Sequence, residues 1–328
     1  MRTEPSDLDR SLLAASLGDG WGLRDPVLSY VPRGGGSHHW RCRATGGEER
    51  WVSLDDLTAT FHAAEDEDAA LAALERALGT AAALRRAGLE FVVAPLPDRD
   101  GRVLRRVGRR YAVRVAPVVG GTPGMFGVYS AADRRRVGAM VGRLHAASAR
   151  IDGGLPAATD LAIPSRASLT AAIAEIGRPW TSGPLAEAAR ALLAPRAGDV
   201  ERRLADHDTT AARVRARSAD WVVTHGEPHG GNVIFDPADG LHLIDWDTAR
   251  RGPRERDLHM VLDDDLTGWD EYCAAVGTVE LDVEALALHR RMWALADIAS
   301  FVAVLRRPHA DTVDMRHALG ALETYLGG

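Results

Sequence analysis

Residues 225–247 read HGEPHGGNVIFDPADGLHLIDWD, and this stretch is the most informative in the chain about the fold. Two short apolar runs, at 233–235 and 241–244, flank a turn rich in Pro, Asp and Gly, which is typical of a β-hairpin. An antiparallel hairpin brings its two outer ends together. We therefore expect Asn232, which enters the first strand, to lie beside Asp245, which leaves the second.

The residue types at the two strand ends indicate a metal site. Amide and carboxylate oxygens are hard ligands that suit Mg²⁺, which proteins hold through one or two groups together with substrate phosphates. Asn232 and Asp245 are the predicted ligands, and Asp247 is a further candidate. Glu227 lies five positions before Asn232 on a loop rich in Gly and Pro, where it can receive a proton from an attacking hydroxyl.

These residues resemble the motifs of the aminoglycoside phosphotransferase (APH) family, whose members are small-molecule kinases with a protein-kinase-like fold. The segments that carry the resemblance are HGEPHGGN and LIDWD, with GPRERDL at 252–258 and Leu144-His145, which is similar to the family's LHA signature. The resemblance covers nearly the whole chain. It implies a small β-rich lobe, a linker and a larger helical lobe.

The resemblance also implies a role for each motif residue. Asn232 and Asp245 would bind Mg²⁺, Glu227 would hold the position of the catalytic base, and the loop would be supported by His225. ATP would lie under the glycine-rich turn with its adenine against the linker, in contact with Gly34, Gly35, Gly36, Ser37, Pro117, Val118 and Val119. These roles agree with the chemistry of phosphoryl transfer, which requires mainly positioning and charge neutralisation.

The chain departs from the family pattern at two points. The family usually has Asp where Glu227 stands, and it places on the third strand a lysine that holds the nucleotide phosphates. This chain contains no lysine, so all 40 basic residues are arginine. The predicted replacements are Arg41, Arg43 and Arg50, with His38 and His39 as further candidates. We expect Glu75 to border the buried face of its helix and therefore to need a cationic partner.

The pattern of the whole chain predicts an α+β fold with a β-rich lobe over 1–117 and a helical lobe over 118–328, and the resemblance implies that the first lobe binds the nucleotide. The helical lobe would hold the catalytic loop and the acceptor site. In the first lobe, short runs rich in β-branched and aromatic residues predict antiparallel strands at 27–30, 40–43, 51–54, 91–96 and 111–119. Between them, an acidic first turn followed by apolar residues at helical spacing predicts a helix at 65–87. Further helices are predicted at 130–148, 169–176, 185–193, 200–217, 283–305 and 315–326.

Composition excludes several classes of protein. The formal net charge of −6 argues against a nucleic-acid binder, which needs a basic excess on at least one face. The two cysteines, Cys42 and Cys273, lie far apart and indicate neither a disulfide framework nor a zinc site, as in a reducing compartment. We expect no secretion signal and no membrane-spanning segment, so the predicted location is the cytoplasm.

The predicted function is that of an ATP-dependent kinase, with GTP as an alternative nucleotide, that phosphorylates a hydroxyl of a small molecule. The resemblance makes an aminoglycoside or aminocyclitol antibiotic the leading acceptor, and acidic residues that suit a cationic molecule follow the hairpin. These residues are Asp263, Asp264, Asp265, Asp270 and Glu271. Such a run is also typical of a solvated face.

Three alternatives remain open. Related kinases phosphorylate macrolides, choline, homoserine or sugars, and the sequence does not separate these acceptors. The missing lysine and the replacement at Glu227 also fit a degenerate kinase-like protein that binds nucleotide or a small molecule without turnover. The third alternative is a zinc hydrolase, whose ligand cluster would be His225, Glu227, His229 and His242, although the spacing is not that of His-Glu-x-x-His. Otherwise we expect His229 to support the loop and His242 to face solvent.

Overall fold

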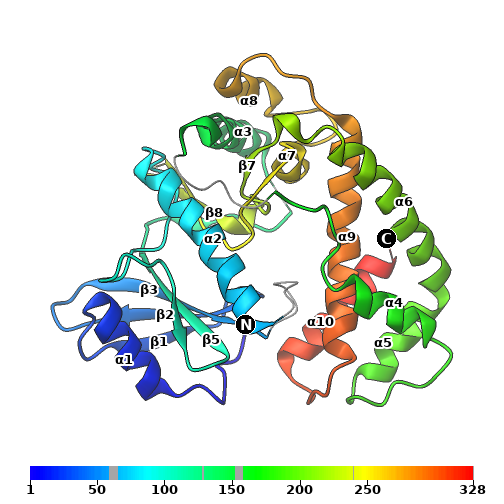
Figure 1. Cartoon of the computed structure of the whole chain (residues 1–328), viewed down its shortest axis with the longest axis horizontal. Helices are drawn as coiled ribbons and strands as arrows, with labels where there is room; N and C mark the ends of the chain where they lie inside the picture. Colours follow the sequence, from blue (N-terminus) through cyan, green and yellow to red (C-terminus); the bar gives the residue numbers. More distant parts are fainter. Residues whose placement is uncertain (59–65, 128, 152–157, 239, 328) are drawn as a thin grey trace.

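The computed structural model describes residues 1–58, 66–127, 129–151, 158–238 and 240–327. A small lobe built around a sheet and a larger lobe of helices are visible in Figure 1, with the long helix α2 lying between the sheet and strand β8. The structure therefore has the α+β, two-lobed architecture that the sequence predicts.

Five strands form the sheet of the small lobe: β1 (Val27–Val31), β2 (Ser37–Arg43), β3 (Glu49–Asp56), β4 (Arg105–Val107) and β5 (Tyr111–Pro117). Their order is β1-β2-β3-β5-β4, and each neighbouring pair is antiparallel. Strands β1, β2 and β3 are each longer than the apolar run that predicted them, β5 ends at Pro117 and not at the predicted residue 119, and β4 was not predicted.

Side chains alternate between the two faces of this sheet. One face is apolar, and its Val52 and Val113 are fully buried in a core shared with helix α1 (Arg10–Trp21). The intervening positions point to the opposite face, where Ser53 is paired with Arg114 across β3 and β5. The sheet thus turns a polar face away from α1.

Helix α2 (Glu67–Arg86) lies on this opposite side of the sheet. Its N-terminus is capped by the Asp66 side chain, which accepts a hydrogen bond from Ala69 N at 2.8 Å. The predicted start at residue 65 lies outside the described residues. Leu74 and Leu78 of α2 belong to a large core that also contains residues of the helical lobe.

The segment after α2 corrects one prediction. The sequence predicts a strand at 91–96, but the structure has only an isolated bridge between Val92 and Leu243. Leu243 N donates to Phe91 O at 2.7 Å, and Val93 N donates to Leu243 O at 3.0 Å. The apolar side chains of this segment pack into the core between the lobes, which holds its backbone beside a strand of the other lobe.

The predicted hairpin is present in the large lobe. Strands β8 (Val233–Asp236) and β9 (Gly240–Leu243) are antiparallel, with Val233 opposite Leu243. A short strand, β6 (Thr122–Pro123), extends this sheet beside β8. Before and after the hairpin, β7 (Val222–Thr224) pairs with β10 (Arg250–Gly252). Residue 239 of the hairpin turn lies outside the described residues.

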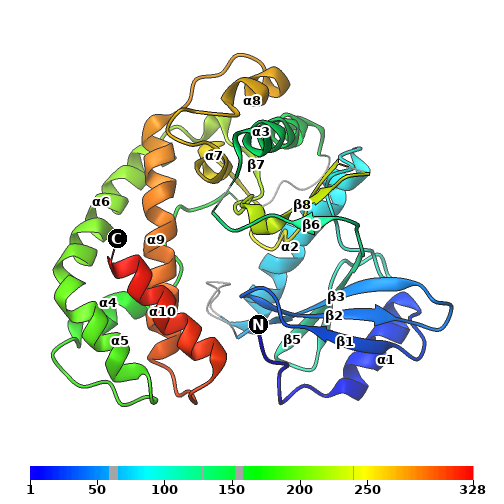
Figure 2. The ribbon, with the colours of Figure 1, turned by 180° about the vertical axis from the view of Figure 1, so that it is seen from behind.

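The helices of the large lobe form two groups. Near the hairpin lie α3 (Ala131–Ala146), α7 (Glu255–Val261) and α8 (Trp269–Val276). The second group packs around its own apolar core and is seen from behind in Figure 2; it contains α4 (Arg166–Ala174), α5 (Ala186–Leu193), α6 (Ala197–Arg215), α9 (Val283–Leu305) and α10 (Val313–Gly327). In the described part of the chain, no helix combines the length and the apolar character needed to cross a membrane.

All the predicted helices are present, and among the α-helices of the described residues α1, α7 and α8 were not predicted. Helix α1 buries few of its residues, among them Leu13 and Leu17, so its apolar pattern is weak. Helix α7 has only seven residues and begins with three charged ones, whereas α8 has apolar residues at 269, 272, 273 and 276 whose helical spacing the sequence analysis missed.

Candidate active site

The outer ends of the β8–β9 hairpin lie side by side, as the hairpin pattern predicts. Ile244 N donates to Asn232 O at 3.0 Å, which fixes Asp245 next to Asn232. The Asn232 amide donates through Nδ2 to the Glu227 carbonyl at 3.0 Å, which leaves its Oδ1 as the atom able to accept or coordinate. Asp245 has a φ of 66°, a strained conformation of the kind that clusters at functional sites.

Three carboxyl groups gather at this point. Burial and then the charge of Asp245 raise the pKa of Glu227 to about 7. The same two causes raise the pKa of Asp247 well above its ordinary value. Such an excess of negative charge is relieved by a bound cation, and carboxylate and amide oxygens suit a divalent one. Asn232 and Asp245 together offer the one or two oxygen ligands that Mg²⁺ takes from a protein, with phosphates and water supplying the others, so this pair fits a magnesium ion.

His225 ties the loop before Glu227 to the hairpin. Its Nε2 donates to Ile244 O at 2.9 Å, and its Nδ1 accepts from Glu227 N at 3.2 Å. Burial lowers the pKa of His225, so the ring is neutral and these two bonds fix its tautomer. The ring also meets Trp246 edge to face, with centroids 4.7 Å apart. His225 thus sets the direction of the backbone at Glu227.

A buried carboxylate holds the same loop from the opposite side. Asp257 on α7 is fully buried and accepts from the backbone N of His225 at 2.9 Å and of Gly226 at 2.6 Å. It also pairs at 3.0 Å with Nε2 of His145 on α3, whose Nδ1 lies 2.9 Å from the Tyr272 hydroxyl. Burial alone would raise the pKa of Asp257, but the hydrogen bond from His145 brings it down to about 2. We refer to Asp257, His145 and the two loop amides as the loop lock.

Two glycines of the loop are required by close packing. Gly226 has a φ of 99°, and a Cβ there would overlap the Arg256 guanidinium. That guanidinium is held in place, because it donates to Thr224 Oγ1 and to the carbonyl of Thr248, both at 2.8 Å. A Cβ at Gly230 would overlap the carbonyl oxygen of the residue at 125. These close contacts keep the loop in one position.

The polar face of the small-lobe sheet supplies a cation to the site. The side chain of Arg114 on β5 is 8% exposed, and its Nη2 lies 3.2 Å from Asp245 Oδ1 and 3.5 Å from Asp55 Oδ1. Ser37, where the glycine-rich turn enters β2, donates to Asp55 Oδ1 at 2.6 Å. The turn, β3 and β5 therefore meet the end of the hairpin. Sequence reasoning missed both Asp55 and Arg114.

The arginines predicted to replace the family lysine lie elsewhere. Arg41 and Arg43 pair with Glu49 and are largely exposed, and Arg50 pairs with Glu48. The reason is local, since the acidic residues at the turn into β3 neutralise the basic residues nearest to them. The prediction of these three arginines is wrong.

The two histidines beside the turn also do not supply a positive charge. His38 lies opposite Leu54 on the apolar face and contacts the Tyr30 hydroxyl at 3.2 Å. His39 is on the polar face, where its Nδ1 lies 3.0 Å from Ser53 Oγ. Burial lowers the pKa of His39 to about 4, so its ring is neutral at physiological pH.

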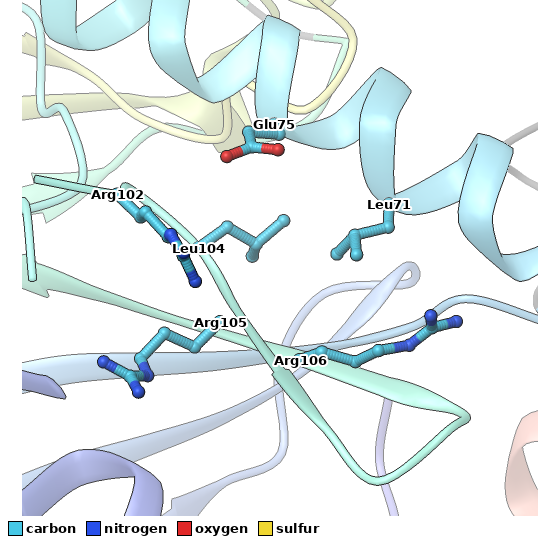
Figure 3. A pocket seen from close by; sticks show the side chains of 6 residues that line it. All are labelled: Leu71, Glu75, Arg102, Leu104, Arg105 and Arg106. Carbon is cyan, nitrogen blue, oxygen red and sulfur yellow. The ribbon is translucent and has the colours of Figure 1, made fainter. Parts of the chain in front are cut away.

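Glu75 is away from this site. It is exposed on α2 and reaches into a hollow of about 480 Å³ (Figure 3), which is lined by Leu71, Glu75, Arg102, Leu104, Arg105 and Arg106. The guanidinium groups of Arg105 and Arg106 point away from the Glu75 carboxylate and pair with Asp98 and Asp68, respectively. Within the described residues Glu75 forms no ion pair, so the expectation that it needs a cationic partner is wrong.

The residues predicted to contact a nucleotide border the polar face of the sheet. Gly34, Gly35 and Gly36 lie between β1 and β2, and Gly34 has a φ of 76°. Pro117 ends β5, three residues after Arg114, and is followed by the half-buried Val118 and Val119. The turn and the linker thus lie at two edges of the surface that carries Arg114.

Aromatic side chains gather around His229 of the loop that carries Glu227. Phe126 meets His229 edge to face with centroids 4.6 Å apart, and Trp293 on α9 lies 6.1 Å from Phe126 and 6.3 Å from His229. Phe126 is 56% exposed, so this surface is open to solvent. We call Phe126, His229 and Trp293 the aromatic cluster. Sequence reasoning did not assign it.

Asp297 lies one helical turn beyond Trp293. Burial raises the pKa of Asp297 to about 6, partly opposed by a hydrogen bond from Tyr325. Trp293 Nε1 in turn donates to the Tyr325 hydroxyl at 3.1 Å. The charge of Asp297 contributes to the raised pKa of Glu227. In the described part of the chain no arginine pairs with Asp297.

The acidic residues predicted to bind the acceptor lie around α8. Three of them have arginine partners at 3.2–3.5 Å, in the pairs Asp263 with Arg134, Asp264 with Arg290 and Glu271 with Arg135. Asp265 and Asp270 are exposed. Helix α8 packs on α3 and lies beyond it from the hairpin in both views (Figures 1 and 2). Asp297 therefore lies close enough to Glu227 to affect its pKa, whereas the five predicted acidic residues lie around α8.

The residues of the zinc alternative do not form a cluster. His242 does not face solvent as predicted, since its side chain is 12% exposed and lies 4.0 Å from Asp236. His229 Nε2 is 3.9 Å from Glu227 Oε2, whereas His225 is bonded to the backbone. Across the described residues, no group of three or more His, Cys, Asp or Glu side chains could hold a metal ion.

Comparison with known proteins gives a match over most of the chain. The family model described as APH, phosphotransferase enzyme family, matches residues 29–294. Protein StrN of Streptomyces griseus is 28% identical over 314 residues, which cover 92% of this chain and 86% of that protein.

Solved structures with the same fold include several with bound nucleotide. Spectinomycin phosphotransferase APH(9)-Ia in complex with ADP and spectinomycin has a TM-score of 0.72 and 14% identity, covering 97% of this chain and 95% of that chain. Amicoumacin kinase hAmiN in complex with AMP-PNP, Ca²⁺ and Ami has a TM-score of 0.57 and 12% identity, covering 97% and 93%. At these identities the likeness describes the fold.

Proposed function

The chain belongs to the phosphotransferase enzyme family, and on that premise we propose that it is a small-molecule kinase that transfers the γ-phosphate of ATP, with Mg²⁺, to an acceptor hydroxyl. The leading acceptor is an aminoglycoside or aminocyclitol antibiotic. The observation that carries the proposal is the juxtaposition of Asn232 and Asp245 at the ends of the hairpin, beside the Glu227 loop.

In this proposal Glu227 accepts the proton of the acceptor hydroxyl as the oxygen attacks. A carboxyl group with a pKa of about 7 is partly ionised at neutral pH and is basic enough to take that proton. His225 and the loop lock hold the backbone of Glu227, so its carboxylate starts from a fixed position. Positioning of this kind accounts for much of the rate in phosphoryl transfer.

Asn232 and Asp245 would hold the magnesium ion. When bound there, Mg²⁺ supplies positive charge that neutralises the phosphate oxygens and aligns them with the acceptor. The nucleotide would lie between the glycine-rich turn at 34–37 and the linker at 117–119. Two neighbours of the same fold were solved with ADP or AMP-PNP, which supports a nucleotide as ligand.

The acceptor would lie between Glu227 and the aromatic cluster. The open ring faces suit the apolar side of a sugar or cyclitol ring, and they also suit an ammonium group. Asp297 adds a carboxylate without an arginine partner, which suits a cationic acceptor. A fold neighbour solved with spectinomycin supports an antibiotic of this kind. Contact with the acidic residues around α8 stays a prediction, and their arginine partners make it the weaker one.

The first experiment is thermal unfolding of the purified protein with ATP or GTP, each with and without Mg²⁺, beside an Asp245→Ala variant. A ligand at about a hundred times its dissociation constant adds roughly 2.7 kcal/mol of stability, which raises the melting temperature by a few degrees. We expect a Mg²⁺-dependent rise in the wild type that the variant loses. If no nucleotide changes the melting temperature, the kinase proposal is wrong.

Transfer of labelled γ-phosphate to a panel of acceptors then identifies the reaction. The panel contains aminoglycosides, spectinomycin-like aminocyclitols, macrolides, choline, homoserine and simple sugars. A phosphorylated aminoglycoside or aminocyclitol supports the proposal. If only another acceptor is phosphorylated, the protein is a kinase for that other class of acceptor. Binding of nucleotide without transfer to any acceptor would favour a degenerate kinase-like binding protein.

A further inference from the structure

The polar face of the small-lobe sheet shows an unusual distribution of buried charge. On β3 the two residues that flank the buried Leu54 are Ser53 and Asp55, and neither is basic. Across the ladder, Ser53 is paired with Arg114 of β5. The buried cation of this face therefore comes from β5, and the buried carboxylate beside it comes from β3.

Arg114 and Asp55 are buried with part of their hydrogen-bonding capacity unused. Arg114 Nη1 and Asp55 Oδ2 have no hydrogen-bond partner among the described residues. A buried polar atom without a partner is costly, and it usually marks a place where another group binds. The other arginine near the site, Arg256, differs in that both of its terminal nitrogens donate to fixed oxygens.

The charge around Arg114 also favours a ligand of mixed charge. Asp55 and Asp245 both lie within 3.5 Å of its Nη2, so two carboxylates already surround the guanidinium. An oxyanion alone would meet repulsion there. A polyphosphate with its divalent cation brings the positive charge that the carboxylates need and the oxygens that a guanidinium binds.

We propose that Arg114 binds the nucleotide phosphates and that Asp55 is the positioning residue that orients it. The pair would replace the arrangement in which a strand lysine binds the phosphates and a helix glutamate orients the lysine. This inference rests on the proposed kinase function. It differs from the sequence prediction in leaving out Glu75 of α2, which is exposed and forms no ion pair within the described residues.

The test is calorimetric binding of adenosine, ADP and ADP with Mg²⁺ to the full chain and to single variants. Arg114→Ala should weaken Mg²⁺-ADP binding by about 10- to 100-fold, the loss expected for charge-assisted hydrogen bonds to phosphate. Adenosine binding should change less than about twofold, because the base lies against the linker. Arg114→Lys should recover part of the loss, since it restores the charge without the fork of donors.

Matched controls separate this role from a general effect of charge or folding. Arg41→Ala removes an exposed arginine from the same face of the same sheet, and Glu75→Ala removes the helix carboxylate; neither should change the ratio of ADP to adenosine affinity. Since Arg114→Ala leaves the Asp55 carboxylate buried without its cation, the double variant Asp55→Asn/Arg114→Gln is measured as well. The double variant should fold, and it should still lose the wild-type preference for ADP over adenosine.

Asp55→Asn alone should reduce the preference for ADP over adenosine with adenosine binding retained, an effect that a merely structural role would not produce. The inference is overturned if Arg114→Ala or the double variant keeps the wild-type preference, or if Glu75→Ala removes it. If the wild-type protein binds neither ADP nor adenosine, the proposed function itself fails. These outcomes are distinct, because the first two require nucleotide binding by the wild type.

Discussion

Two charged clusters flank the end of β9, and they differ in how completely their polar atoms are paired. In the loop lock, Asp257 accepts from two backbone amides and from His145, which itself contacts Tyr272. In the second cluster, Arg114 and Asp55 each keep a buried atom without a partner among the described residues. Both clusters are buried, yet one is complete within the protein and the other is not.

Two aspartates near the end of β9 therefore have pKa values that are shifted in opposite directions. The hydrogen bond from His145 brings the pKa of Asp257 down to about 2 despite its burial, whereas burial and a neighbouring carboxylate raise the pKa of Asp247. A carboxylate whose hydrogen bonds are all satisfied stabilises the fold. Carboxylates that repel each other are typical of functional sites, where a ligand supplies the positive charge that the protein lacks.

Asp245→Ala should have the largest effect on activity. We expect phosphate transfer to fall by about 10³-fold or more, because the loss of a metal ligand removes several kcal/mol of charge stabilisation from the transition state. The unfolding temperature should stay close to that of the wild type, since the repulsion of Glu227 and Asp247 is relieved. Steady-state transfer assays and thermal unfolding of the same preparation measure both. An Asp245→Ala variant with full turnover would contradict the assignment of Asp245 as a metal ligand. A large fall in its unfolding temperature would contradict the view that, unlike the loop lock, the carboxylates of this site do not stabilise the fold.

Asp257→Ala should instead reduce stability. Removal of a buried, fully bonded carboxylate leaves His145 and two loop amides without their partner, and we expect the free energy of unfolding to fall by about 3–5 kcal/mol. Denaturant unfolding at pH 7 measures the difference. Since the pKa of Asp257 is lowered to about 2, its contribution is complete above the ordinary Asp value and is lost as the pH falls through about 2. Wild type and variant should therefore converge in strong acid, and a constant difference there would argue against the carboxylate as the cause.

Glu227→Gln should lower turnover by about 10²- to 10⁴-fold, the usual contribution of a general base. Glu227→Asp should retain part of the activity, because the shorter side chain still carries a base and matches the residue common in the family. Single-turnover transfer at saturating nucleotide and acceptor measures the chemical step. A Glu227→Gln variant with wild-type turnover would rule out Glu227 as the base.

The smallest predicted effect concerns Asp297. If Asp297 binds a cationic acceptor, its affinity should fall about tenfold between pH 7.5 and pH 5, because a carboxyl with a pKa of about 6 is only about one-tenth ionised at pH 5. Asp297→Asn should bind the acceptor weakly at both pH values. Acceptor KM is measured across this range, with the KM for Mg²⁺-ATP at the same pH as the reference. A pH profile that Asp297→Asn leaves unchanged would remove Asp297 from the acceptor site.

The sequence predicted the elements whose signal is local. The hairpin at 225–247, the lobe order and all the long helices of the large lobe follow from turn residues and helical periodicity, and the structure confirms them. The adjacency of Asn232 and Asp245 follows as well, because two strands joined by a short turn leave no other choice of partner. The roles given to these residues stay proposals.

What the sequence did not predict depends on pairing between distant residues. The run Val113-Arg114-Val115 does indicate that Arg114 faces away from its neighbours, but only the sheet order β3-β5 places it beside Asp55. We predicted that the acidic residues at 263–271 bind the acceptor, because their arginine partners on α3 and α9 are distant in sequence and could not be recognised. Asp297, in contrast, carried a usable signal, since it is an isolated acid within an apolar helix.

The hydrogen bonds between Leu243 and residues 91 and 93 also bear on how the chain folds as it is synthesised. These partners are about 150 residues apart in sequence, so a ribosome that adds about 5–20 residues per second reaches the second partner about 10–30 s after the first. Until then the apolar segment after α2 has no strand to pair with, and the shared core lacks one side. We expect the two lobes to complete folding together, so a fragment that ends at the linker would leave that apolar surface exposed to aggregation.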